Sequence, residues 1–224
     1  MLKQPKNRHS PTLAEEMALL EQGYSFIAGL DEAGRGCLAG PVVAAAVILP
    51  LQDCDETMIR LAGVNDSKQL TAEQRTRLYD VIMQYAVTVG VGMGSVALID
   101  EHNILNATKQ AMHHALARLE VAPQALLLDA IQLPGITLPQ RSIIKGDSLC
   151  LSIAAASIVA KVTRDRLMIR LHEEYPHYGF ARHKGYGTPA HLEALRLYGA
   201  CPHHRRSFSP VREMCSSLFP DLHG

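Results

Sequence analysis

Short apolar runs alternate with helical segments along most of this 224-residue chain, and the alternation limits the fold more than any other feature. The strand candidates are residues 24–31, 41–49, 87–93, 125–128 and 142–145. The helix candidates are residues 11–22, 71–85, 96–120, 147–174 and 190–198, and a last helix after Ser209-Pro210. Residues 51–70 are expected to be irregular. The order predicts an α/β fold, with a central mixed sheet flanked by helices.

Composition limits the function only weakly. Lys/Arg and Asp/Glu number 22 each, so the formal net charge is zero. Residues 1–140 hold 10 Lys/Arg against 15 Asp/Glu, and residues 141–224 hold 12 against 7. This asymmetry fits a bipolar cleft, and chance scatter over a solvated surface explains it equally well. Five widely spaced cysteines, no Cys-x-x-Cys pair, no secretory signal and no membrane-spanning run indicate a reducing cytoplasm.

Four acidic residues lie at the ends of predicted strands or just before a predicted helix. Asp31 and Glu32 end the first apolar run, Asp129 ends the fourth, and Asp147 precedes the long helix. Neighbours in a strand point to opposite faces, so Asp31 and Glu32 share a site only if the chain bends at the following glycine-rich turn. Taken singly, each acid has an ordinary explanation: a charged hairpin, a turn, or a helix N-cap for Asp147.

Together, the four carboxylates predict an oxygen-only metal site. Mg²⁺ and Mn²⁺ prefer carboxylates and water to His and Cys as ligands. Two such ions about 4 Å apart hold an attacking water and a leaving oxygen in line at a phosphodiester. We therefore predict a metal-dependent nuclease.

A series of collinear motifs resembles those of bacterial ribonuclease HII, the type 2 ribonuclease H, over roughly residues 24–212. These motifs are residues 29–36 (GLDEAGRG), 38–42, 65–70 (NDSKQL), 128–129, 145–148 (KGDS), 154–158, 160–165, 178–180, 183–188 (HKGYGT) and 203–208 (HHRRSF). The resemblance implies an RNase H-like fold with a C-terminal helical extension, and Mn²⁺ or Mg²⁺ as the cofactor. It also implies cleavage on the 5′ side of ribonucleotides embedded in duplex DNA, and cleavage of RNA in RNA–DNA hybrids. We expect a cytoplasmic monomer that binds nucleic acid and no membrane.

The resemblance assigns roles to individual residues. Asp31, Glu32, Asp129 and Asp147 match the catalytic, metal-binding acids. The turn Gly34-Arg35-Gly36 matches the one that reads the ribose 2′-OH, and Tyr186 matches the tyrosine that packs at the sugar beside the scissile phosphate. Further contacts near the phosphates are expected from Asn65, Ser67, Lys68, Lys145, Arg164 and Lys184.

The glycine-rich turn has a chemical reason to read ribose. Two glycines bring backbone N–H and C=O groups close to a sugar, and the 2′-OH both donates and accepts hydrogen bonds. A methyl group at Gly34 is expected to lie against that sugar. Apart from the resemblance, an ordinary tight turn explains residues 34–36 and a surface or core-capping side chain explains Tyr186. The segment His203-His204-Arg205-Arg206 is either a phosphate contact or a solvated basic patch.

Two residues depart from the family pattern, and both are small. Cys37 stands where a proline is common, and Ala130 stands where a glycine is common; neither has an evident chemical role. Residues 1–22 are expected to form an N-terminal helical extension, and 23–212 the catalytic domain with its helical C-terminal part. Residues 213–224 are expected to form a tail.

Two rival functions belong to different classes. In a metal-independent ribonuclease, histidines activate the 2′-OH as nucleophile and leave a cyclic phosphate, and eleven histidines make this worth testing. A binding module would hold hybrids without cutting them. Four carboxylates argue against the binding module, because negative charge facing phosphate weakens binding.

Overall fold

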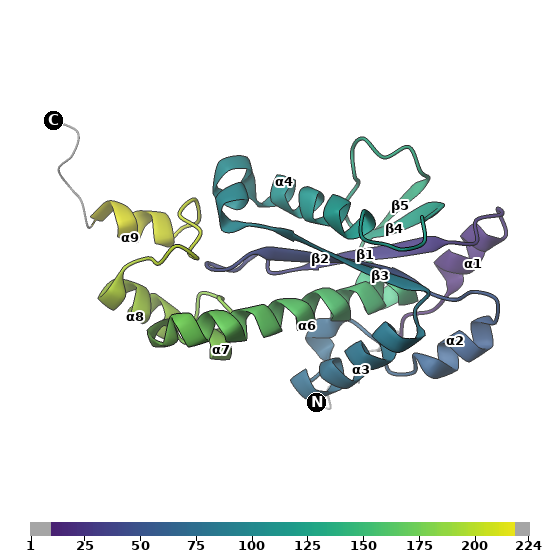
Figure 1. Cartoon of the computed structure of the whole chain (residues 1–224), viewed down its shortest axis with the longest axis horizontal. Coiled ribbons are helices and arrows are strands. Elements are labelled where there is room, and N and C mark those ends of the chain that lie inside the picture. Colours follow the sequence, from purple (N-terminus) through teal and green to yellow (C-terminus); the bar gives the residue numbers. More distant parts are fainter. Residues whose placement is uncertain (1–9, 218–224) are drawn as a thin grey trace, which may run out of the picture. The chain divides into compact units, whose positions relative to one another are not determined.

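The computed structural model describes residues 10–217 and has the predicted α/β architecture (Figure 1). The strands are β1 (Ile27–Ala33), β2 (Val42–Ile48), β3 (Thr88–Gly94), β4 (Ala125–Asp129) and β5 (Gln140–Ile143). The helices are α1 (Ala14–Leu20), α2 (Cys54–Arg60), α3 (Ala72–Tyr85), α4 (Val96–Leu116), α5 (Gly146–Leu149), α6 (Leu151–Glu174), α7 (Phe180–His183), α8 (Pro189–Tyr198) and α9 (Val211–Ser217), with 3-10 turns η1 (Ser67–Gln69) and η2 (Pro176–Tyr178). Residues 1–9 of the predicted extension and 218–224 of the predicted tail lie outside the described residues.

The strands form one mixed sheet in the order β3-β2-β1-β4-β5. All seven residues of β2 are buried, as its continuous valine- and alanine-rich run predicts. Helix α3 begins at the predicted capping box, in which Thr71 and Gln74 each accept a backbone N–H of the other.

The expectation of an irregular segment at 51–70 is wrong, because α2 lies within it. Asp53 caps this helix by accepting the N–H of Glu56 at 2.9 Å, and two acids occupy its first turn. These capping signals are local and visible in the sequence. The helix is short and polar, so it lacks the long apolar periodicity from which the other helices are predicted.

The described chain forms two compact units, whose boundaries fall inside β1, β2, β3 and α6. The first unit comprises the described residues up to Asp31, with 46–90 and 119–159; it contains β4, β5, α1, α2, α3 and α5. The second unit comprises 32–45, 91–118 and the described residues from 160 onward; it contains α4, α7, α8 and α9. Among the described helices, none combines the length and apolar character that a bilayer span requires.

Close packing in the first unit depends on one glycine of the motif GLDEAGRG. A Cβ atom at Gly29 would lie 2.3 Å from the carbonyl carbon of Ser152, at the start of α6. Only glycine therefore lets β1 approach this helix. The packing holds the carboxyl end of β1 in a fixed position against the segment that follows Asp147.

Candidate metal centre and substrate-reading loops

Three aspartates from separate segments of the first unit meet at one edge of the sheet. Strands β1 and β4 are parallel, and the residue before Asp31 pairs with the residue before Asp129. These two acids therefore lie level near the carboxyl ends of neighbouring strands. Asp147 follows β5, the next parallel strand, in the short helix α5. One carboxylate oxygen from each aspartate lies within 4.8 Å of the others; Asp31 and Asp147 are buried and Asp129 is half-buried.

Hydrogen bonds and an ion pair orient the aspartates. Asp129 accepts the N–H of Gly146 at 2.9 Å, and Asp147 accepts a hydrogen bond from the Lys68 ammonium at 3.1 Å. Burial raises the pKa of Asp147; Lys68 opposes the rise, and the carboxylates of Asp66 and Asp129 add to it. The cluster concentrates negative charge that a cation would neutralise. Its all-oxygen donor set fits Mg²⁺ or Mn²⁺.

Asp147 does not cap the long helix, because α6 begins only at Leu151 and Asp147 lies inside the short helix α5. Lys145, in a left-handed conformation, occupies the N-cap position of α5, and no side chain caps this helix. The carboxylate of Asp147 instead reaches Lys68 and the other two aspartates.

Glu32, the fourth predicted acid, is held by a contact within the second unit. Its Oε1 accepts a hydrogen bond from Nη1 of Arg35 at 3.0 Å. Strand β1 continues to Ala33, so the expected bend comes after both acids. The cluster of close carboxylate oxygens consists of the three aspartates, and a metal-binding role for Glu32 stays a prediction.

The turn Gly34-Arg35-Gly36 follows β1 and has one closed side and one open side. Gly34 has a φ of +96°, and a Cβ atom there would lie 2.0 Å from Nε of Arg164. The expectation that a methyl group at Gly34 would face the sugar is therefore wrong, because it would strike Arg164. At Gly36, by contrast, an added Cβ would meet no described atom within 4 Å.

Tyr186 lies on the loop after α7, with 44% of its surface exposed. The loop is tied to the segment that follows the turn, because Leu38 donates its N–H to the carbonyl of Gly185 at 2.8 Å. Burial raises the pKa of Tyr186, and so does the Cys37 thiol, which hydrogen-bonds to its side chain. Cys37, which had no evident role in the sequence, thus links the turn to Tyr186 within the second unit.

The other predicted phosphate contacts occupy different environments. Lys68 is exposed and paired with one of the three aspartates, and Lys145 is exposed beside α5. Asn65 is half-buried, and its side-chain oxygen accepts the N–H of the next residue at 2.8 Å. Ser67 is buried, and its hydroxyl shares a hydrogen bond of 2.9 Å with Ser157. Burial favours an internal role for Ser67 over a direct phosphate contact.

Arg164 is fully buried, which favours an internal role, and its expected place near the phosphates stays a prediction. Its guanidinium donates to the carbonyls of Pro41, Lys184 and Ala39 at 3.0, 2.8 and 2.9 Å. Arg164 therefore joins the segment after the glycine-rich turn to the loop that carries Tyr186. Lys184 itself is half-buried, and its phosphate contact stays a prediction.

Only part of the segment His203-His204-Arg205-Arg206 is a solvated patch: Arg206 is exposed and His203 is half-buried. His204 and Arg205 are buried. The hydrogen bonds fix the ring protons: Nδ1 of His204 accepts the N–H of Cys201 at 3.0 Å, so its Nε2 donates to Nε2 of His191 at 3.0 Å. Nδ1 of His191 then donates to the carbonyl of Tyr186 at 2.9 Å. Both histidines are neutral, and the chain of bonds ends on the loop of Tyr186.

This histidine pair predicts acid sensitivity of the fold. Burial lowers the pKa of His191 to about 4 and, with the neighbouring His191 ring, that of His204 to about 3. Unfolded histidines titrate near 6.5, so the unfolded state binds more protons and stability is lost as pH falls from about 6.5 towards 4. Between pH 7.5 and pH 5 we expect urea unfolding to show a loss on the order of 2–4 kcal/mol.

The His204→Gln variant should lose much of this pH dependence, since one of the two titrating rings of the pair is gone. His102→Gln is the matched control, because the His102 side chain is 54% exposed. An unfolding free energy that stays constant from pH 7.5 to pH 5 in the wild-type protein would contradict the neutral-pair assignment.

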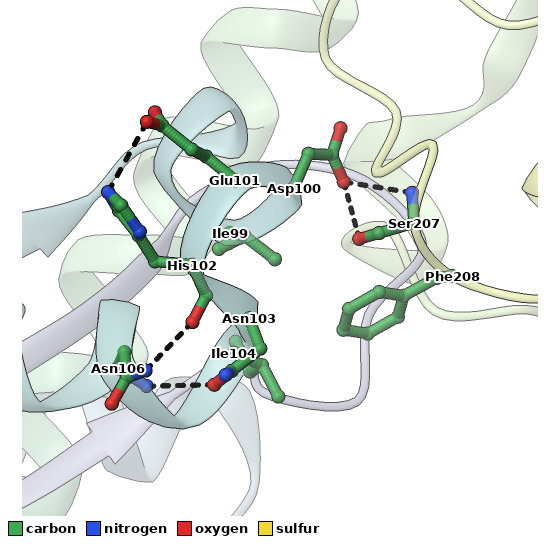
Figure 2. A pocket seen from close by; sticks show the side chains of 9 residues that line it. All are labelled: Ile99, Asp100, Glu101, His102, Asn103, Ile104, Asn106, Ser207 and Phe208. Carbon is green, nitrogen blue, oxygen red and sulfur yellow. Dashed lines mark hydrogen bonds and ion pairs between the residues drawn. The ribbon is translucent and has the colours of Figure 1, made fainter.

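A surface pocket of about 540 Å³ lies where α4 meets the C-terminal segment of the second unit. Figure 2 shows the Asp100 carboxylate turned towards Ser207, with Phe208 on the pocket wall. Asp100 accepts hydrogen bonds from the N–H and the hydroxyl of Ser207 at 2.9 and 2.6 Å. Asn103 breaks α4 here, with a φ of 66°, and accepts the N–H of Asn106 at 3.1 Å. The pocket contains none of the three clustered aspartates, and its Asp100 contacts join α4 to residues 206–207.

Known proteins resemble this chain in sequence and in fold. Residues 28–211 match the family described as Ribonuclease HII. The Ribonuclease HII of Chloroflexus aurantiacus is 56% identical over 208 residues, which cover 93% of this chain and 98% of that protein. The Ribonuclease HII of Acetivibrio thermocellus is 54% identical over a stretch that covers 91% of this chain and 77% of that protein. The crystal structure of the ribonuclease H2 from Pyrococcus horikoshii matches with a TM-score of 0.71 and 29% identity, covering 88% of this chain and 100% of that one.

An α/β sheet with clustered aspartates, together with these likenesses, defines a hydrolytic nuclease of the ribonuclease H class. Such an enzyme acts on nucleic acid. Within that class, the chain belongs to the ribonuclease HII family, which confirms the resemblance of its motifs.

Proposed function

We propose that this chain cleaves the phosphodiester on the 5′ side of ribonucleotides embedded in duplex DNA, and RNA in RNA–DNA hybrids, leaving 5′-phosphate and 3′-OH ends. The observation that carries the proposal is the aspartate cluster, with carboxylate oxygens within 4.8 Å of one another. One chain supplies all three aspartates, which supports an active monomer. We place its action in the cytoplasm.

Asp31, Asp129 and Asp147 would hold the cofactor, together with Glu32. Mn²⁺ or Mg²⁺ bound there supplies an activated water and neutralises charge on the phosphate. The N–H of Gly146 donates a hydrogen bond of 2.9 Å to the Asp129 carboxylate and so fixes its orientation. Hydrogen bonds of this kind, made to a metal ligand by a neighbouring group, hold the ligand in place before a cation binds.

Ribose recognition falls to the turn Gly34-Arg35-Gly36 and to Tyr186. Gly34 comes three residues after Asp31, so their Cα atoms are at most about 11 Å apart along the chain. An unmet buried hydrogen-bonding group costs about 1–3 kcal/mol, so a turn that pairs with the 2′-OH penalises deoxyribose. Tyr186 would pack on the neighbouring sugar. Lys68, Lys145, Lys184 and Asn65 are proposed to lie near the phosphates.

The test is cleavage of an end-labelled duplex with a single ribonucleotide, beside a matched all-DNA duplex. We expect one cut on the 5′ side of the ribonucleotide, 5′-phosphate and 3′-OH ends, and no cut in the all-DNA duplex. EDTA should abolish cleavage, and added Mg²⁺ or Mn²⁺ should restore it.

The same assay separates the rival functions. A cyclic phosphate product, formed equally well in EDTA, would establish a histidine mechanism and overturn the metal-based proposal. Binding of the duplex without cleavage, in Mg²⁺ and in Mn²⁺ alike, would identify a binding module.

A further inference from the structure

Arg205 holds the Gly34-Arg35-Gly36 turn from inside the second unit. The side chain is fully buried. Its Nη2 donates to the carbonyl of Gly34 at 2.7 Å, and its Nη1 donates to the carbonyl of Arg35 at 2.8 Å. Its Nε and Nη2 also donate to the carbonyl of Gly40, at 3.0 and 2.8 Å. All three guanidinium nitrogens are therefore engaged by one loop.

Bonds to two consecutive carbonyls fix the direction of two amide N–H groups. In a planar trans peptide, the C=O and the N–H point in opposite directions. Arg205 draws the carbonyls of Gly34 and Arg35 towards itself, so the N–H groups of Arg35 and Gly36 point away from it. The side of Gly36 where a Cβ would project is open for 4 Å. The turn can thus present two N–H donors to a ligand oxygen.

The position of Arg205 is itself supported by its neighbours. The guanidinium carbon lies 5.1 Å from the centre of the Phe208 ring. Asp100 holds the intervening segment, because it accepts the N–H of Arg206 at 3.0 Å. It also accepts the N–H of Ser207 at 2.9 Å (Figure 2). Burial lowers the pKa of Arg205 to about 10, so the guanidinium stays charged at neutral pH.

We propose that Arg205 is a positioning residue for ribose recognition, which orients the peptide groups of the Gly34-Arg35-Gly36 turn towards the 2′-OH without touching the substrate. The inference rests on the proposed function, because it assumes that this turn reads ribose. A planar guanidinium fork suits this task, because it meets several carbonyls in one fixed geometry. A lysine ammonium is compact and flexible and cannot reproduce the fork.

The test compares Arg205→Lys with the wild-type protein on the single-ribonucleotide duplex in Mg²⁺. We expect kcat/KM per folded molecule to fall roughly 10-fold or more, since a misplacement of about 1 Å can cost 100-fold. Affinity for the all-DNA duplex, measured separately, should stay within about 2-fold, because the residues proposed to lie near the phosphates are outside the turn.

Met112→Ala is the control for a purely structural role. Met112 is fully buried in α4 of the same unit, and its truncation destabilises the protein without changing the turn. Its kcat/KM per folded molecule should match that of the wild type. Arg205→Lys with wild-type activity per folded molecule would overturn the inference.

Two further variants keep the result decisive. If Arg205→Lys does not fold, Phe208→Leu removes the ring beneath the guanidinium; a loss of ribonucleotide cleavage supports the inference, and unchanged cleavage overturns it. Gly36→Ala tests whether the turn reads ribose at all. If Gly36→Ala impairs cleavage while Arg205→Lys does not, only the role of Arg205 fails. If neither impairs it, the assignment of ribose reading to the turn fails.

Discussion

Asp129→Asn should abolish cleavage while leaving the fold intact. The amide keeps the shape of the side chain, and its oxygen can still accept the Gly146 N–H that Asp129 binds at 2.9 Å. It lacks the negative charge that makes a carboxylate a strong ligand for a divalent cation. Loss of groups that merely support a metal ligand costs 10–100-fold, so we expect loss of the ligand itself to exceed about 100-fold in kcat.

Duplex binding by Asp129→Asn should survive or tighten, since one negative charge facing phosphate is removed. Asp53→Asn is the matched control, because Asp53 also accepts a backbone N–H at 2.9 Å and lies outside the aspartate cluster. It should cleave at the wild-type rate. An Asp129→Asn enzyme that cuts as fast as this control would show that Asp129 is structural.

Alanine at Gly34 should lower the stability of the fold, whereas alanine at Gly36 should lower cleavage and leave the stability unchanged. Gly34→Ala combines a φ of +96° with a Cβ placed 2.0 Å from Arg164 Nε, so we expect it to destabilise the fold by roughly 2–5 kcal/mol. Gly36→Ala projects its methyl group into open space, and its folding stability should change by less than about 0.5 kcal/mol. The methyl group would then occupy the side from which we propose that a ribose approaches.

Cleavage and unfolding measured on the same preparations separate the two effects. Gly36→Ala should keep the wild-type unfolding midpoint and lose roughly 10-fold or more in kcat/KM on the single-ribonucleotide duplex. Gly34→Ala should unfold at lower urea concentration. Wild-type cleavage by Gly36→Ala would show that no substrate approaches that side of the turn.

Local sequence determined much of the fold and the identity of the main acids. The period of the apolar runs marks strands and helices, and the capping box at Thr71 fixes the start of α3, because these signals act within a few residues. Asp129 ends β4 and Asp31 lies near the carboxyl end of β1, and the carboxyl ends of such strands are where functional groups gather. The family resemblance of the motifs supplied the roles that we propose for the turn and for Tyr186.

Tertiary structure decided which polar residues lie inside. In sequence, Asp147 had a helix cap as its ordinary explanation, and the parallel pairing of β4 with β5 places it in the cluster instead. Arg164 and Arg205 look like phosphate-binding residues, yet both are fully buried and donate to backbone carbonyls of the loops. The carbonyls that accept from Arg205 are more than 160 residues away in sequence, so no local pattern could reveal them. Charge is a property of the residue, whereas burial and partners are set by the segments that the fold brings beside it.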